Sequence, residues 1–231
     1  MSVQAIAHRG AHREFPENSL SAFKQAIADK ADGIELDVRL CGSDDVIIFH
    51  DPWLKRMMGS SGNVRRLSLK DLKQISYLDH PKEFIITLGE LFEEIGGRIS
   101  INVEIKDVNL LNHQLVKKVV QLINEFKLKD SIWISSFNPM VIDVVKLVDS
   151  TMRTGFLFNK LRYLPLLLGS FMNFDAWHPN YQLVDDHLME VARKRNKQVF
   201  SWTVNDPAEI DRLTQLGIDG IITDDTSLIR K

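Results

Sequence analysis

The sequence predicts an α/β protein, a (β/α)8 or TIM barrel. Short apolar runs alternate with longer amphipathic stretches, and no linker, low-complexity tract or long charge run divides the chain. The chain has 231 residues, a length at which α/β barrels form one unit. Alternating strands and helices imply parallel pairing with right-handed crossovers. We therefore expect residues 1–231 to form a single barrel domain.

The apolar runs are predicted to be strands. They are short, mostly β-branched or aromatic, and bounded by turn residues. They cover residues 3–7, 33–40, 46–49, 100–105, 131–135, 154–158, 175–177, 199–204 and 220–223.

Helical patterns lie between most of these runs. Residues 18–30 carry an apolar stripe at helical spacing and begin with two candidate N-caps, Asn18 and Ser19. A second stripe of this kind spans residues 110–126. These stretches supply the crossovers that parallel strands need.

Nine runs exceed by one the eight strands of a closed barrel, and the link between the second and third resolves the surplus. Only residues 41–45 separate these two runs. Because a parallel crossover needs about a dozen residues or more, this link must be a hairpin within residues 33–50. Eight parallel strands then remain. An open doubly wound sheet is the alternative, but no Gly-rich dinucleotide loop follows the first run.

The composition limits the partners and the compartment. Net charge is 29 − 31 = −2, which gives no electrostatic footprint for nucleic acid. Cys41 is the only cysteine, so no internal disulfide forms and a reducing compartment is expected. Residues 1–7 are too short for a secretory signal, and the apolar region 161–174 is too short to span a bilayer. We expect a cytoplasmic protein without stable membrane insertion, and the oligomeric state stays open.

Carboxylates fall on the predicted strands. Glu35 and Asp37 are two residues apart and share one face of their strand, and Glu104 lies near the end of another. The C-terminal ends of barrel strands converge on one mouth. Inward-facing carboxylates carry a large desolvation cost unless a cation offsets it, and clustered oxygens suit Mg²⁺ or Ca²⁺. The alternative is a set of salt bridges to Arg39 and Lys106.

Two histidines and two cations lie at the same strand ends. His8 and His50 can exchange protons near neutral pH, which suits acid–base chemistry. Arg9 and Lys106 carry positive charge suited to an anionic phosphoryl group. The alternatives are hydrogen-bonded structural histidines and cations that only neutralise the carboxylates. His12 lies near the mouth but has no strand position.

Six short blocks occur in a fixed order between residue 8 and about residue 224. They are His8-Arg9-Gly10, Pro16-Glu17-Asn18-Ser19, Glu35-Leu36-Asp37-Val38, His50-Asp51, Glu104-Ile105-Lys106 and Trp202-Thr203-Val204-Asn205. Together they resemble the glycerophosphodiester phosphodiesterase family. A lone His-Arg-Gly is a weak signal, but all six blocks in this order are specific.

The resemblance implies a TIM barrel that hydrolyses glycerophosphodiesters, small-molecule substrates, to glycerol 3-phosphate and an alcohol. It implies roles for seven side chains: Glu35, Asp37 and Glu104 bind one divalent cation, Mg²⁺ or Ca²⁺, His8 and His50 are the acid–base pair, and Arg9 and Lys106 hold the phosphate. Trp202 offers an apolar face to the glycerol backbone or packs in the core. The insertion expected after the His-Asp block, about 51–84, is short, with residues 68–75 as its one clear helical element.

The chain departs from the family pattern in two places. Met57-Met58 replaces a Thr pair, which bears on the pocket shape, and Thr223-Asp224-Asp225-Thr226 replaces Thr-Asp-x-Pro. Neither departure falls on a proposed catalytic group.

Two other functions remain as alternatives. The apolar residues 164–168, with Phe171 and Met172, could meet acyl chains, giving a lysophospholipase D, although we favour a helix packed on the barrel. A phosphate-binding barrel without catalysis should lack some acid, base or metal group.

Overall fold

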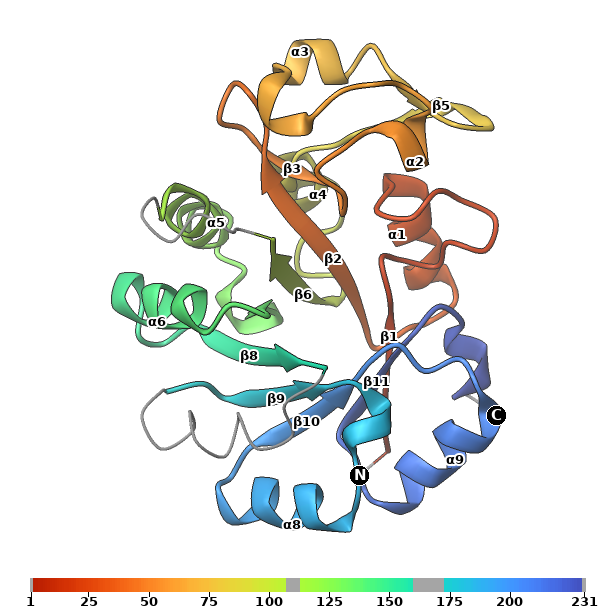
Figure 1. The fold of residues 1–231 in the computed structure, drawn as a ribbon, viewed down its shortest axis with the longest axis vertical. Helices are drawn as coiled ribbons and strands as arrows, with labels where there is room; N and C mark the ends of the chain where they lie inside the picture. Colours follow the sequence, from red (N-terminus) through yellow and green to blue (C-terminus); the bar gives the residue numbers. More distant parts are fainter. Residues whose placement is uncertain (1, 107–112, 160–172, 230–231) are drawn as a thin grey trace.

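The computed structural model describes residues 2–106, 113–159 and 173–229. Eight parallel strands close into a barrel, because β1 pairs with both β2 and β11 (Figure 1). These strands are β1 (Gln4–Ala7), β2 (Gly33–Leu40), β6 (Ser100–Ile105), β7 (Ile132–Ser136), β8 (Arg153–Phe158), β9 (Ala176–Pro179), β10 (Gln198–Ser201) and β11 (Gly220–Thr223). The predicted TIM barrel is confirmed. The boundaries of β2, β6 and β11 are those expected, and those of the other strands differ by one to three residues.

The ninth strand forms the expected hairpin. β3 (Val46–Ile48) runs antiparallel to β2, with Val38 opposite Ile48 and Leu40 opposite Val46. This pairing keeps β3 outside the closed ring of parallel strands. It also returns the chain to the mouth of the barrel, where His50 follows.

Helices cover the outside of the barrel (Figure 1). Those within the described residues are α1 (Leu20–Ala28), α4 (Leu88–Ile95), α5 (Gln114–Glu125), α6 (Pro139–Val148), α8 (Asp186–Lys194) and α9 (Pro207–Gln215). Most begin at side-chain caps that satisfy free backbone N–H groups. Of the two expected caps of α1, Ser19 is the one used: its hydroxyl accepts from the backbone N–H of Ala22.

The insertion contains more structure than the sequence indicated. It holds α2 (Lys55–Met58), α3 (Leu69–Leu72), β4 (Ser76–Tyr77) and β5 (His80–Phe84), and lies beyond β3 at the top of Figure 1. The helix expected over 68–75 is reduced to the four residues of α3. The two short strands pair with each other rather than with the barrel. Short 3-10 helices complete the fold at Val64–Arg66, Lys129–Ser131, Tyr181–Leu183 and Thr226–Leu228.

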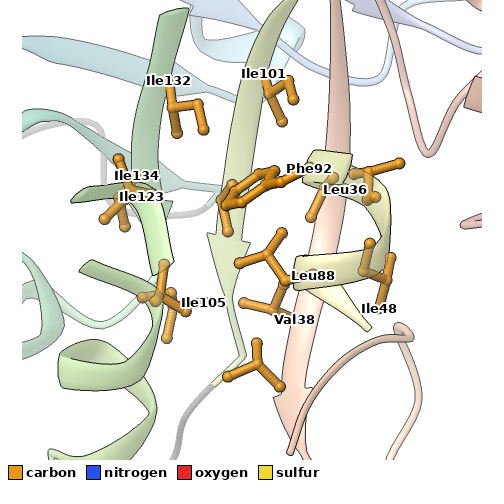
Figure 2. Packing of buried hydrophobic residues seen from close by; sticks show 14 of the residues in the cluster. Leu36, Val38, Ile48, Leu88, Phe92, Ile101, Ile105, Ile123, Ile132 and Ile134 are labelled. Carbon is orange, nitrogen blue, oxygen red and sulfur yellow. The ribbon is translucent and has the colours of Figure 1, made fainter. Parts of the chain in front are cut away.

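The largest core lies between the barrel and its helices. Figure 2 shows Leu36 and Val38 of β2 in one cluster with Leu88 and Phe92 of α4. Side chains on a strand alternate between its two faces. Because Leu36 and Val38 face the helices, the odd-numbered residues of β2 point into the barrel. The apolar outer face of β2 thereby fixes the inward direction of its carboxylates.

Two expectations fall partly or wholly beyond the described residues. The helix expected over 110–126 is described from Gln114 onward as α5. The apolar stretch 164–168, with its proposed helix, lies outside the described residues. Among the helices that the structure describes, none is long and apolar enough to cross a membrane.

Candidate active site

Three buried carboxylates meet at the mouth of the barrel. Asp37 of β2 lies directly opposite Glu104 of β6 in the parallel pairing, and Glu35 is one pleat away on β2. One oxygen of each lies within 4.8 Å of the others. All three side chains are buried. The structure therefore brings together the three residues that the sequence singled out as metal ligands.

Two cations partly balance these carboxylates. Lys106 Nζ lies 2.6 Å from Glu104 Oε1 and 3.1 Å from Asp37 Oδ1. Arg9 Nε lies 3.3 Å from Asp37 Oδ2, and the Arg9 guanidinium also donates to Glu17. The expected ion pair of Lys106 is therefore present. Arg39, the other cation considered, donates to the backbone carbonyls of His50 and Lys106.

The electrostatics of the cluster favour an added cation. Burial, followed by the charges of Asp37 and Glu104, raises the pKa of Glu35 well above its usual value. Burial also raises the pKa of Glu104 to about 7, against the opposing charge of Lys106. The pKa of Asp37 is lowered, because the charges of Lys106 and Arg9 outweigh its burial. Without a metal, the cluster therefore resists full ionisation at neutral pH.

The hydrogen bonding of the carboxylate cluster also favours an added cation. Asp37 Oδ1 and Glu104 Oε1 contact Lys106, yet both are buried without a hydrogen bond of normal geometry. Buried carboxylate oxygens are usually satisfied by donors or by a metal. Glu35, Asp37 and Glu104 form an all-oxygen donor set without sulfur, which fits a hard divalent cation.

His8 and His50 are both anchored through Nδ1 at the same mouth. His8 Nδ1 donates to Asp224 Oδ1 over 2.7 Å, and His8 Nε2 lies 4.0 Å from Glu35. His50 Nδ1 donates to Asp51 Oδ1 over 2.6 Å. Burial lowers the pKa of His50 against the opposing charge of Asp37. In both rings Nδ1 is held and Nε2 is left for another partner.

A second group of potential ligands surrounds Asp224. His8, His12 and Asp224 each offer an atom within 4.8 Å of the others. Here the nitrogens already have an acceptor: His12 Nε2 donates to the same Asp224 Oδ1 over 3.0 Å. These polar atoms are satisfied by one another, whereas the carboxylate cluster has oxygens that are not. We therefore take Glu35, Asp37 and Glu104 as the candidate metal centre.

A cavity of about 270 Å³ joins these groups. Its described lining combines the charged and histidine side chains with an apolar wall: His8, Arg9, Glu35, His50, Asn102, Glu104, Lys106, Phe137, Leu157, Asn159, Trp202, Thr203 and Ile222. Trp202 lies in this wall and meets the ring of Phe137 edge-on at 5.2 Å. Its indole N–H donates to the carbonyl of His178, which fixes the ring. Seven of the eight predicted site residues line the cavity, and the eighth, Asp37, contacts two of them, Arg9 and Lys106.

Sequence reasoning missed several residues that hold the site together. Asn18 is buried at a positive φ of 60°, and its side chain donates to Asp37 Oδ2 over 2.8 Å. Arg56 bridges Asp51 and Glu17. Asn18 and Glu17 belong to the Pro-Glu-Asn-Ser block, so their place in that block was the available signal. His12 was expected near the mouth, but without a strand position the sequence did not indicate its contact with Asp224.

The two departures from the family pattern differ in how close they lie to the site. Met58 is buried in the core of the insertion, and neither it nor Met57 is among the described residues of the cavity. At the other departure, Thr226 begins the last 3-10 helix. Asp224, in the same block, contacts His8 directly, so this block bears on the site more than the sequence indicated.

Comparisons with known proteins agree with this geometry. The model of the glycerophosphoryl diester phosphodiesterase family matches residues 8–228. A glycerophosphodiester phosphodiesterase of Caldanaerobacter subterraneus subsp. tengcongensis is 33% identical over 100% of this chain and 99% of its own. A lysophospholipase D of Mus musculus is 28% identical over 95% of this chain and 82% of its own.

A solved structure shows the same fold. The phosphodiesterase of Oleispira antarctica, in complex with the product sn-glycerol-3-phosphate, matches with a TM-score of 0.92 at 24% identity, covering 98% of this chain and 95% of that chain. The family match spans nearly the whole chain, including every residue of the site. The chain belongs to the glycerophosphoryl diester phosphodiesterase family and is a phosphodiester hydrolase.

Proposed function

We propose that this protein is a metal-dependent glycerophosphodiesterase that releases glycerol 3-phosphate and an alcohol. The observation that carries the proposal is a cluster of three buried carboxylates beside a cavity that two anchored histidines line. The product named in the Oleispira antarctica structure supports the substrate class. Glu35, Asp37 and Glu104 would hold one divalent cation, Mg²⁺ or Ca²⁺, which when bound neutralises charge growing on the phosphoryl oxygens.

Arg9 and Lys106 would bind the phosphate. Both line the cavity and both also contact Asp37, which holds their side chains at the cavity edge. Burial lowers the pKa of Lys106, but the charges of Asp37 and Glu104 outweigh it, so the ammonium stays protonated at neutral pH. Two fixed positive charges beside an anionic diester lower the cost of forming a more highly charged transition state.

The histidines would move the protons. His8 Nε2 takes a proton from the attacking oxygen, which forms the new bond to phosphorus. His50 gives a proton to the leaving alcohol oxygen as its bond to phosphorus breaks. The attacker is either water or the glycerol hydroxyl, the latter through a cyclic phosphate that water then opens. In both routes the net reaction adds one water to the diester and restores the two histidines.

The apolar wall would receive the carbon backbone of the substrate. Trp202 presents its ring to the cavity beside Phe137. This wall faces the charged side of the pocket, so a glycerol phosphate would place its carbons and its phosphate against matching surfaces.

The deciding experiment follows release of glycerol 3-phosphate from glycerophosphocholine. We expect release that stops in EDTA and returns with added Mg²⁺ or Ca²⁺. Activity that persists in EDTA, with metal analysis showing no retained ion, would contradict the carboxylate–metal centre. Glu104→Gln should lose activity in the same assay, while Glu94→Gln, an exposed glutamate of α4, should not.

A second substrate class has support of its own. Phe137 is 39% exposed at the cavity, and the mouse relative is named a lysophospholipase D. An apolar, open rim of this kind could accept an acyl chain. Parallel assays with glycerophosphocholine and a lysophospholipid separate the two, and a higher kcat/KM on the lipid would favour the lysophospholipase activity.

A non-catalytic binding barrel is the least supported alternative. The candidate acid, base, phosphate-binding and metal-binding groups are all present among the described residues. Binding of glycerol 3-phosphate without turnover of any diester, with metal supplied, would support it.

A further inference from the structure

Asp224 follows β11 at the mouth of the barrel and faces His8 across the β1–β11 pair. Ala7 lies opposite Thr223 in this parallel register, and the backbone N–H of His8 donates to the carbonyl of Thr223. The residues that follow each strand are therefore neighbours, although 216 positions separate them in the sequence. Closure of the barrel itself brings the carboxylate to the imidazole.

The Asp224 carboxylate is held from both sides. Oδ1 accepts from His8 Nδ1 over 2.7 Å and from His12 Nε2 over 3.0 Å. Oδ2 accepts from the side-chain amide of Asn205 over 2.6 Å. Asn205 in turn accepts from the backbone N–H of Asp224 and from the hydroxyl of Thr223. Three donors therefore hold the two carboxylate oxygens, and the bond from the Asp224 backbone N–H to Asn205 holds the main chain beside them. Together these bonds fix the orientation of the carboxylate.

We propose that Asp224 is a positioning residue: it fixes the His8 ring and keeps its proton on Nδ1, so that the Nε2 lone pair faces the cavity. Asn205 and His12 act with it by fixing the carboxylate. This inference rests on the proposed function, in which His8 is the base.

The direction of the His8 ring supports the assignment. Because a carboxylate only accepts, the bond at 2.7 Å requires the proton of neutral His8 to be on Nδ1. The opposite ring nitrogen then points toward Glu35, 4.0 Å away, and into the cavity. Burial would raise the pKa of Asp224, but the hydrogen bonds from His12 and His8 outweigh it and keep the carboxyl ionised. His50 and Asp51 repeat the same arrangement on the other side of the cavity.

An asparagine at this position cannot reproduce these contacts. An amide presents one oxygen and one NH₂ group, whereas His8 and His12 on one side and Asn205 on the other all donate. Whichever way the amide turns, a donor faces a donor. Asp224→Asn therefore keeps the shape of the side chain and removes its function as an acceptor on one side.

The matched control is the neighbouring aspartate. Asp225 pairs with Arg13 and accepts from the backbone N–H of Ser227 at the start of the last 3-10 helix. Asparagine caps helices as well as aspartate does, so Asp225→Asn makes the same chemical change one residue away. It removes no contact to His8.

The first measurement compares kcat, KM and metal binding in the two variants. We expect Asp224→Asn to lower kcat about 10²-fold, with KM and the metal dissociation constant within about twofold of wild type. Asp225→Asn should keep wild-type kcat. Wild-type kcat in Asp224→Asn, or an equal loss in both variants, would overturn the proposal.

A double-mutant cycle separates this proposal from the proposed function. If His8→Ala keeps wild-type kcat, His8 is not the base and the proposed mechanism fails. If His8→Ala loses activity, adding Asp224→Asn should cost little more, because Asp224 acts through His8. A further full loss in the double variant would show that Asp224 acts elsewhere and would overturn the positioning role alone.

A spectroscopic test can be made on the wild-type protein first. The ¹⁵N chemical shifts of neutral His8 in the metal-loaded wild-type protein report which ring nitrogen carries the proton. We expect the proton on Nδ1, and a shift of population toward Nε2 in Asp224→Asn. A wild-type His8 with its proton on Nε2 would contradict the proposal directly.

Discussion

A histidine ring serves proton transfer best when one nitrogen is held and the other is left for the substrate. His8 and His50 meet this condition through Asp224 and Asp51. His178 does not: it is fully buried, and burial lowers its pKa to about 3, so it stays neutral at working pH. At the scale of single residues, the neighbours of each ring distinguish the proposed acid and base from a core histidine.

Alanine variants test these two roles. We expect His8→Ala and His50→Ala each to lower kcat by about 10² to 10⁴, the usual contribution of a general acid or base. His187→Ala, on the exposed face of α8, is the matched control and should keep wild-type kcat. Steady-state assays with metal supplied make the comparison, and unchanged turnover in both site variants would contradict the assignment.

The sequence predicted the site residues themselves better than the contacts that hold their side chains in place. Glu35 and Asp37 could be assigned to one face because a strand alternates its side chains strictly. Asn18 could not be assigned to Asp37, because its contact depends on a positive φ in a loop. Likewise, the distance from His8 to Asp224 depends on which strands close the barrel. Side chains on regular elements are predictable from spacing, whereas contacts made through loops are not.

At the scale of elements, the strong strand patterns were predicted and the weak ones were missed. The five-residue link before Val46 correctly required a hairpin, because no parallel crossover fits that length. The pair β4 and β5 was missed because Ser76–Tyr77 is two residues long and His80–Phe84 contains a proline and charges. His80, expected in a loop, begins β5. Such short strands form because they pair with each other, and the sequence of each strand alone does not indicate that pairing.

Packing between β8 and β9 leads to a prediction on stability. Gly155 lies on β8 beneath the imidazole of His178, and a Cβ placed there would lie 2.4 Å from His178 Nε2. The ring cannot move away easily, because it is buried and packs against Phe200 at 5.4 Å. We expect Gly155→Ala to lower the free energy of unfolding by about 1–3 kcal/mol, the usual cost of overpacking a core. Chemical denaturation measures this.

The control uses the same pair of positions. His178→Ala removes the ring that the new methyl group would strike. The double variant Gly155→Ala/His178→Ala should therefore be more stable than the sum of the two single losses implies. If the two losses in the free energy of unfolding were additive, the new methyl group would clash with a group other than the His178 ring.

At the scale of the whole molecule, closure of the barrel creates the site. β1 pairs with β2 on one side and β11 on the other, so the first and last strands adjoin. His8 thereby meets Glu35 from one neighbour and Asp224 from the other. The count of eight parallel strands predicted this closure, and the lack of a Gly-rich loop after the first strand argued against an open sheet. The same closure gathers buried negative charge at one end of the molecule, and that charge links stability to pH and metal.

In the metal-free protein, the raised pKa of Glu104 should stabilise the folded state progressively less as pH rises from about 5 to 7. Glu104 has a pKa of about 7 in the folded protein against an ordinary value of 4.5, so the folded state keeps a proton that the unfolded chain releases. The contribution of Glu104 therefore falls with rising pH across this window, and Glu35 acts in the same direction. The lowered pKa values of His178 and His50 act oppositely between about pH 5 and 6.5, because the unfolded chain binds protons there that the folded state does not. The effect of Glu104 is therefore the difference between wild type and Glu104→Gln. The lowered pKa of Asp37 acts oppositely, but that contribution is complete once pH exceeds its ordinary value of 3.8. At about 1.36 kcal/mol per pKa unit, Glu104 alone contributes a loss on the order of 3 kcal/mol.

Thermal unfolding of wild type and Glu104→Gln in EDTA from pH 5 to 7.5 measures this loss as the difference between the two profiles, and repeating it in saturating Mg²⁺ or Ca²⁺ tests its cause. A bound cation stabilises the ionised carboxylates, so the loss should shrink or disappear, and metal binding at pH 7 should release protons. Glu104→Gln removes one titrating group from the cluster. Its stability in EDTA should therefore fall less, or rise more, with pH than that of wild type, and it should respond more weakly to metal. If the variant kept the wild-type slope, the titrating groups would lie elsewhere in the chain, and if metal left the wild-type slope unchanged, the buried carboxylates would not be its ligands.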